Sequence, residues 1–150
     1  MNFSIISKIP PPVFFFLGLV LMKITPLYFS FNSNYILAFL FLFLSGIFAL
    51  MSVATFLFKG KSSIHTWKTN DVDELYTQGI YRFSRNPMYF SLVLALIAWF
   101  FYLGNPASLW VVISFVWIVT HFQIKAEEQS LKKLFGEQYL QYQKKVRRWI

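Results

Sequence analysis

The sequence predicts an all-helical protein that crosses a membrane several times. Hydrophobic residues make up 57% of the 150 residues and aromatic residues 21%, whereas charged residues make up only 13%. Soluble domains carry about 25% charged residues, so this composition excludes most of them. The apolar residues fall into four long stretches, and the net charge of +8 is concentrated between and after them. We therefore expect an all-α, polytopic membrane protein with four transmembrane helices and a C-terminal amphipathic helix, forming one domain over residues 1–150.

Four apolar stretches come close to the ~20 residues that a helix needs to cross the hydrocarbon core of a bilayer. They run over about residues 13–31, 35–58, 88–103 and 107–124. The second carries no charge, whereas the first is interrupted by Lys23 and Pro26. The prolines that begin at Pro10 cannot continue a helix, so they mark the start of the first stretch. Gly104 and Pro106 lie between the last two stretches and predict a tight antiparallel hairpin.

The basic residues indicate which way the helices cross the membrane. The loop after the second stretch and the C-terminal tail hold most of them: Lys59, Lys61, Lys68, Arg82, Arg85, Lys125, Lys132, Lys133, Lys144, Lys145, Arg147 and Arg148. The turns around residues 32–34 and 105 hold none. The positive-inside rule places the loop and the tail in the cytoplasm, and four spans then place the N-terminus there too. We expect a multi-pass protein with both termini cytoplasmic.

The composition also excludes several kinds of chemistry. The chain has no cysteine, so it has no thiolate nucleophile and no thiolate ligand for a metal. Its two histidines, His65 and His121, are too few for most metal sites, and we expect no metal. Topology and anionic lipid account for the positive charge. We therefore expect membrane lipids as partners and no nucleic acid.

A first polar segment, residues 75–89, leads into the third apolar stretch with the sequence LYTQGIYRFSRNPMY. Gly79 suits a tight turn, and Pro87 suits the first position of a helix. The N-terminus of that helix would offer unpaired N–H groups and the positive end of the helix dipole, which favour a carboxylate or a phosphate. Arg82 and Arg85 would add to this preference. The alternative is that both arginines only mark the cytoplasmic side and contact lipid headgroups.

A second polar segment, residues 123–150, follows the fourth stretch. Glu127 and Glu128 come almost at once, and one interpretation is a carboxylate at the mouth of a cavity. The alternative is solvated charge paired with Lys132 or Lys133 at helical spacing. Apolar residues then recur at steps of three and four, which predicts a basic amphipathic helix on an anionic leaflet, with a bend at Gly136. These residues are Leu131, Leu134, Phe135, Tyr139, Tyr142, Val146 and Trp149.

The two segments together resemble the isoprenylcysteine carboxyl methyltransferase and phospholipid methyltransferase superfamily. The family pattern is G-x-Y-x-x-x-R-[HN]-P-x-Y, then a pair of glutamates, then leucine, F-G-x-x-Y-x-x-Y and a basic end. It is met by Gly79, Tyr81, Arg85, Asn86, Pro87, Tyr89, Glu127, Glu128, Leu131, Phe135, Gly136, Tyr139, Tyr142, Val146, Arg147, Arg148 and Trp149. The resemblance covers about residues 60 to 150, and the first two apolar stretches share only their hydropathy with the family.

This resemblance implies S-adenosylmethionine as the methyl donor. Its carboxylate calls for N–H groups and an arginine, its ribose hydroxyls call for a carboxylate, and its sulfonium favours aromatic faces. The residues that the resemblance assigns to the donor are Gly79, Tyr81, Arg85, Asn86, Pro87, Tyr89, Glu127 and Glu128, with Arg85 and Glu127 as the catalytic pair. Methyl transfer needs alignment and exclusion of water, and it needs no covalent nucleophile.

The implied function is methyl transfer to a lipophilic acceptor, an isoprenylcysteine-like carboxylate or a phospholipid amine, at the cytoplasmic face. Asn86 is the form of the motif common in bacteria, so we expect a bacterial inner membrane. Related bacterial members carry Asn-Pro and a second proline before the glycine, where this chain has His65, Thr66 and Thr69. Two alternatives are a membrane reductase of the sterol-reductase-like branch with a nicotinamide cofactor, and a non-enzymatic membrane interaction protein.

Overall fold

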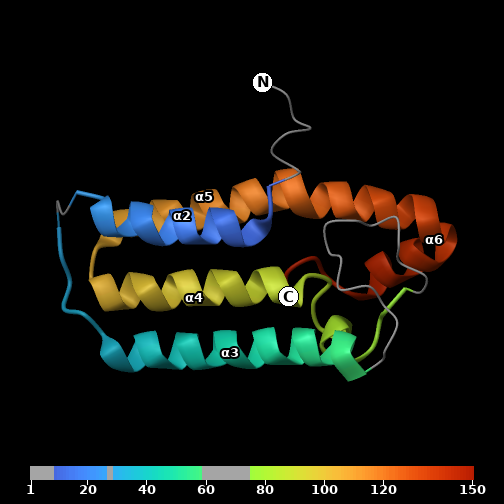
Figure 1. The fold of residues 1–150 in the computed structure, drawn as a ribbon, viewed down its shortest axis with the longest axis horizontal. Coiled ribbons are helices and arrows are strands. Elements are labelled where there is room, and N and C mark those ends of the chain that lie inside the picture. The colour runs from blue at the N-terminus through green and yellow to red at the C-terminus, as the bar shows by residue number, and fades with distance from the viewer. Residues whose placement is uncertain (1–8, 27–28, 59–74) are drawn as a thin grey trace.

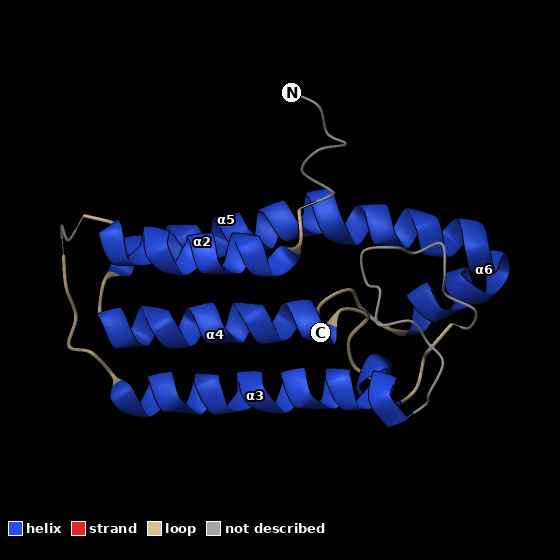
Figure 2. Cartoon of the chain, viewed as in Figure 1, coloured by secondary structure: helices blue, strands red, loops and turns tan. Residues whose placement is uncertain are grey.

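The computed structural model describes residues 9–26, 29–58 and 75–150, and every regular element within them is helical (Figures 1 and 2). The elements are α2 (Pro11–Ile24), α3 (Tyr35–Phe58), the short 3-10 helix η2 (Gly79–Arg82), α4 (Pro87–Leu103), a second 3-10 turn η3 (Pro106–Ser108), α5 (Leu109–Ile118), a π-helical segment η4 (Val119–Ile124) and α6 (Lys125–Lys145). The all-α prediction is confirmed for these residues.

Helix α4 is the centre of the fold, because it packs against α3, α2 and α5. Figure 1 shows α4 between α3 on one side and the pair α2 and α5 on the other. The core of this bundle is apolar, with Leu96 fully enclosed. Its buried members are Met22, Tyr89, Val93, Leu96, Val112, Phe115, Val119 and Ile124. The outer face of α3 is apolar as well, and Ile36, Phe39 and Leu50 are exposed there. Apolar residues on both faces are typical of a helix in a lipid environment.

Two helical stretches are long and apolar enough to cross a membrane: Tyr35–Thr55 and the continuous run Pro106–Lys145. With 14 and 17 residues, α2 and α4 are shorter apolar helices. At a rise of 1.5 Å per residue they are about 21 and 26 Å long, less than the ~30 Å of the hydrocarbon core. The prediction of four spans is therefore supported for two of them.

The first predicted span is wrong in extent. Residues 13–31 were expected to form one helix, but α2 begins at Pro11 and ends at Ile24. Both the backbone N–H and the hydroxyl of Thr25 donate to the carbonyl of Leu21, at 3.0 and 2.7 Å. Pro26 follows and cannot continue the helical hydrogen bonds. The helix therefore ends just before Thr25 and Pro26.

The predicted hairpin between the third and fourth apolar stretches is confirmed. Gly104 ends α4 in the left-handed region, with its N–H donating to the carbonyl of Phe100 at 3.1 Å. Asn105 then accepts from the N–H of Ala107 and donates to the carbonyl of Thr25, both at 3.1 Å. One side chain thus turns the chain from α4 into α5 and joins this turn to the end of α2.

Helices α5, η4 and α6 form one long rod that bends back near its end. Gly136 interrupts α6 with φ 49° and ψ −122°, a conformation outside the helical region. Figure 1 shows the last part of α6 returning, so that the C-terminus lies beside the start of α4. The predicted bend is therefore confirmed. The prediction that the apolar face rests on a leaflet is not supported, because Tyr139, Tyr142 and Val146 are buried against Leu75, Leu131 and Phe135 of the protein itself.

Candidate functional site at the start of helix α4

The first polar segment makes a tight turn before α4. Gly79 begins η2 with φ 60°, in the left-handed region that side chains with a Cβ rarely adopt. The turn places the carbonyl of Tyr81 where it accepts a hydrogen bond of 2.7 Å from the hydroxyl of Tyr142 in α6. Burial raises the pKa of the Tyr81 phenol well above its ordinary value, with further contributions from Tyr142 and Glu127. Tyr81 is therefore a neutral aromatic group fixed next to the second polar segment.

Three charged side chains meet at the end of this turn. Arg85 Nη1 lies 2.9 Å from Glu128 Oε1, and both side chains are only 10% exposed. Arg148 binds the same carboxylate in a fork, Nε to Oε1 at 2.9 Å and Nη2 to Oε2 at 2.8 Å. Arg85 Nη1 also donates to the hydroxyl of Tyr139 at 3.4 Å. The cluster therefore holds two positive charges and one negative charge.

The surroundings of Glu128 keep its carboxylate ionised. Burial alone would raise the pKa of Glu128, but the hydrogen bonds from Arg148 and the charges of Arg85 and Arg148 outweigh it and leave the pKa below its ordinary value. The expected alternative, a solvated pair with Lys132 or Lys133, is wrong, because the direct partners are the two arginines. For Arg85, which the other alternative assigned to lipid headgroups, the partner within the protein is the same carboxylate.

Glu127, although next in sequence, lies in a different environment. Its Oε1 accepts a hydrogen bond from the hydroxyl of Tyr89, the third residue of α4. Burial raises the pKa of Glu127 to about 7; the Tyr89 hydrogen bond opposes this shift, and the charge of Glu128 adds to it. The two adjacent glutamates therefore differ: the surroundings of Glu128 favour its ionised form, and those of Glu127 favour its protonated form.

The C-terminal tail completes the cluster. The N–H of Arg85 donates to the carbonyl of Arg147 at 3.1 Å, and Asn86 Nδ2 donates to the carbonyl of Arg148 at 2.9 Å. The side chain of Asn86 therefore binds the C-terminal tail, and it does not cap the N-terminus of α4. Pro87 is the first residue of α4, as predicted.

One donor of the cluster has no partner. Arg85 Nε is buried and makes no hydrogen bond within the described part of the chain. A buried donor without an acceptor is costly, at about 1–3 kcal/mol, and more for a charged group. The arrangement therefore offers a positively charged N–H to an acceptor that is not one of these residues, such as the carboxylate of a ligand.

All the predicted site residues lie in this region, and several of them are paired within the protein. Arg85 pairs with Glu128, Tyr89 with Glu127 and Asn86 with the tail. Arg82 points to a different place and is exposed, away from this ion pair. His65, Thr66 and Thr69 lie outside the described residues. Within the described ranges, no group of three histidine or acidic residues is placed to hold a metal ion.

The sequence interpretation missed the roles of Arg148, Tyr139 and Tyr142. All three belong to the matched pattern, but the basic end was attributed to topology and the tyrosines to a face on lipid. Arg148 lies twenty positions after Glu128, and only the return of the chain after Gly136 brings the two together. Their positions in the family pattern could have indicated these roles, but an interpretation based on charge and hydropathy alone ignores those positions.

Comparison with known proteins identifies the family of the chain. A family model described as phospholipid methyltransferase matches residues 33–138, well over half of the chain. The chain belongs to the phospholipid methyltransferase family. No solved structure matches it.

The relatives of this chain include one uncharacterized protein and several protein-S-isoprenylcysteine O-methyltransferases. An uncharacterized protein of Haemophilus influenzae is 46% identical over 63 residues, which are 42% of this chain and all of that protein. Protein-S-isoprenylcysteine O-methyltransferase B of Arabidopsis thaliana is 32% identical over 89 residues, 58% of this chain and 45% of that protein. The Saccharomyces cerevisiae protein-S-isoprenylcysteine O-methyltransferase is 33% identical over 89 residues, 58% of this chain and 37% of that protein. The chain thus spans less than half the length of these two enzymes. The family and these relatives indicate a methyltransferase of the isoprenylcysteine or phospholipid type, and its apolar helices are consistent with a membrane location.

Proposed function

We propose that the protein transfers a methyl group from S-adenosylmethionine to a lipophilic acceptor at the cytoplasmic face of a membrane. The observation that carries this proposal is that both segments of the matched pattern, more than thirty positions apart, converge on one cluster at the start of α4. Family membership supports the reaction type. The donor, the acceptor and the side of the membrane are the proposed parts.

The residues of the cluster fit the donor. The unpaired N–H of Arg85 suits its carboxylate, since charge-assisted hydrogen bonds to arginine are among the strong ones. The carboxyl of Glu127 suits a ribose hydroxyl or the sulfonium charge. The faces of Tyr81 and Tyr89 suit a cation. When bound, S-adenosylmethionine would supply an electrophilic methyl group, while the protein binds, orients and excludes water.

The two acceptor classes make different demands on Glu127. A carboxylate acceptor loses no proton when it is methylated, whereas an ammonium must lose one first. A buried carboxyl whose pKa is raised to about 7 can accept that proton at neutral pH. We assign Glu127 this proton-accepting role if the acceptor is a phospholipid amine, and an orienting role if it is an isoprenylcysteine-like carboxylate.

Binding of the donor tests the proposal. Protein purified in detergent should bind S-adenosylmethionine in calorimetry, and Arg85→Ala should weaken binding by more than about tenfold, the loss expected when a charged hydrogen bond of roughly 1.5–3 kcal/mol is removed. Lys133→Ala, on the exposed surface of α6, is the matched control and should bind normally. Arg85→Lys keeps the charge but lacks the Nε–H, so weaker binding in this variant at an unchanged melting temperature would assign the loss to that N–H and not to unfolding.

Failure of the folded wild-type protein to bind the donor would overturn the proposal. Binding of a reduced nicotinamide in its place would favour the reductase alternative. Unchanged function in cells that carry Arg85→Ala, Glu127→Gln and Glu128→Gln together would favour a non-enzymatic interaction protein.

A further inference from the structure

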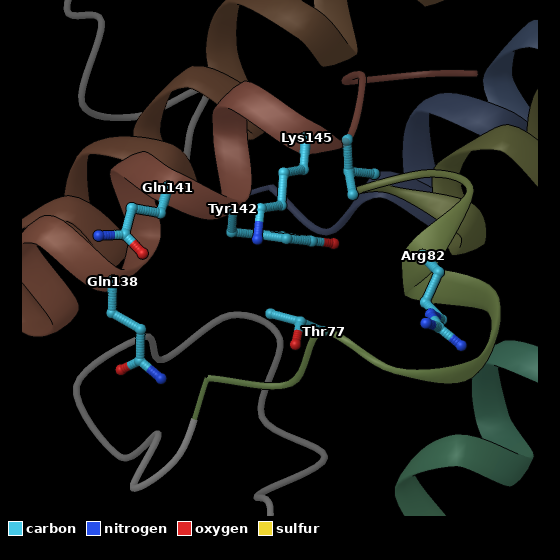
Figure 3. Close-up of a pocket in the computed structure, with 7 residues that line it drawn as sticks. Thr77, Arg82, Gln138, Gln141, Tyr142 and Lys145 are labelled. Atoms are coloured by element: carbon cyan, nitrogen blue, oxygen red, sulfur yellow. The ribbon is translucent and has the colours of Figure 1, made fainter.

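A cavity of about 330 Å³ lies beside the candidate site, between the η2 segment and the second half of α6. Its lining consists of Thr77, Arg82, Gln138, Gln141, Tyr142, Lys145 and Val146. Figure 3 shows Arg82 on one side of this cavity and the α6 residues Gln138, Gln141 and Lys145 on the other. We propose that the cavity binds a phosphate group, carried either by the headgroup of an anionic lipid or by a free phosphate compound.

The chemistry of the lining carries the proposal. Arg82 and Lys145 bring two positive charges to one cavity, and no carboxylate is among its seven described lining residues. The described residues also show no ion pair for either cation. The amides of Gln138 and Gln141 and the hydroxyl of Thr77 add neutral donors. Two cations that share a concave site with neutral donors suit a phosphate, which offers several acceptor oxygens and at least one negative charge.

The lining of the cavity suits a phosphate better than it suits the proposed methyl donor. Arg82 and Lys145 would attract the carboxylate of the donor but repel its sulfonium and its ammonium. None of the described lining residues is a carboxylate that could bind the ribose hydroxyls. Glu127, the acidic group that suits the donor, does not line it. The cavity and the candidate site nevertheless share a wall, because Tyr142 lines the cavity while its hydroxyl donates to the carbonyl of Tyr81. The two are neighbouring sites, and of the two only the candidate site includes the carboxyl of Glu127.

The position of the cavity suits a lipid phosphate as well as a free one. It lies at the polar end of the bundle, where both basic segments meet (Figure 1). Phe83, next to Arg82 in sequence, is 71% exposed. An exposed aromatic side chain beside a cationic cavity is suited to the boundary between headgroups and acyl chains.

The proposal is tested on the full chain in a neutral detergent, with inorganic phosphate and with dihexanoyl phosphatidylglycerol as probes and dihexanoyl phosphatidylcholine as the comparison lipid. Saturable binding is measured by calorimetry. Arg82→Gln with Lys145→Gln should weaken it by more than about tenfold, because two charged hydrogen-bond donors are lost. Lys133→Gln with Lys144→Gln removes the same charge from exposed positions outside the cavity and should leave binding unchanged.

The probes distinguish the two sources. Tighter binding of phosphatidylglycerol than of phosphate supports a lipid headgroup, and equal or tighter binding of phosphate supports a free compound. Three results would overturn the proposal: no saturable binding of either probe, equal loss in both double variants, or full displacement of the probe by S-adenosylmethionine. Binding of the donor is measured on the same preparation, so this proposal and the methyltransferase proposal fail separately.

Discussion

At the residue scale, Glu128 organises the candidate site. Its single carboxylate holds Arg85 from the start of α4 and Arg148 from the C-terminal tail, within 3 Å of each. Removing charges from water is costly, so such a cluster is stable only when each partner is in place. Because three separate parts of the chain contribute, this cluster also joins them. The candidate site thereby depends on residues of the C-terminal tail.

The two-point contact between Arg148 and Glu128 predicts that replacing Arg148 destabilises the protein. Arg148→Ala should lower the free energy of unfolding in detergent by about 1–2 kcal/mol, below the 3–5 kcal/mol of a fully buried pair because Arg148 is 34% exposed and Arg85 remains. Arg148→Lys should recover only part of this loss, since lysine cannot bind both oxygens in a plane. Arg147→Ala is the control, because only its backbone carbonyl takes part. Equal destabilisation in both alanine variants would contradict the role of the fork.

The raised pKa of Glu127 predicts that the stability of the protein depends on pH. Its pKa in the folded protein, about 7, lies above its ordinary value of 4.5, so the folded state binds this proton more tightly than the unfolded state does. Its contribution to stability is fully present below pH 4.5 and is lost as the pH rises through 7. The wild-type melting temperature should therefore fall between about pH 5 and pH 8 more steeply than that of Glu127→Gln. Glu137→Gln, at an exposed position, should keep the wild-type slope, and a parallel slope in Glu127→Gln would refute the assignment.

At the scale of elements, the site depends on the two halves of α6 running in different directions. The first half carries Glu127 and Glu128 past the start of α4, and the second half returns Tyr139 and Tyr142 to the same place. Only the backbone at Gly136, with φ 49° and ψ −122°, separates these directions. A straight helix of the same sequence would carry both tyrosines away from Arg85. The bend is thus a requirement of the site.

Replacing the glycine tests this requirement. Gly136→Ala should destabilise the protein by about 1–2 kcal/mol, because a Cβ disfavours this conformation although no neighbouring atom lies within 4 Å. It should also reduce binding of the donor. Gly46→Ala is the matched control in α3, where the space is equally open and φ is not positive. There the exchange should be neutral or stabilising by about 0.5–1 kcal/mol. Thermal unfolding of both variants would show whether Gly136→Ala lowers the melting temperature while Gly46→Ala leaves it unchanged or raises it.

These elements show what the sequence could and could not predict. Proline at the first position of α4, the hairpin at Gly104 and the bend at Gly136 are local signals, and each was predicted. The partner of Glu128 was not predicted. Arg148 comes close to Glu128 only because the chain turns back at Gly136 in a particular direction, and no local sequence pattern specifies that direction. The short extent of α2 was overlooked because hydropathy continues past Thr25 and Pro26, whereas helical hydrogen bonding does not. Local chemistry was thus easier to predict than contacts between distant segments.

At the scale of the whole molecule, the two kinds of surface are separated along the bundle. Polar clusters, the cavity and the C-terminal tail gather at one end, where α4 begins (Figure 1). The opposite end holds the turns around residues 32–34 and 105, which carry no charged side chain. Lys23, in the last turn of α2, lies near these turns, but most of the basic residues lie at the other end of the bundle. The positive-inside rule therefore favours an orientation with that basic end in the cytoplasm. In this orientation, the proposed soluble donor and lipid-dissolved acceptor would meet at the same end of the molecule.

The absence of cysteine from the natural sequence allows this orientation to be tested directly. In intact bacterial cells, a membrane-impermeant maleimide should label Asn32→Cys, in the uncharged turn, and should leave Glu137→Cys, in α6, unlabelled. Permeabilised cells should show labelling of both, because both positions are exposed in the structure. Wild-type protein, which has no thiol, is the control for non-specific reaction. Labelling of Glu137→Cys alone in intact cells would place the basic end outside, and the proposed cytoplasmic site would then be wrong.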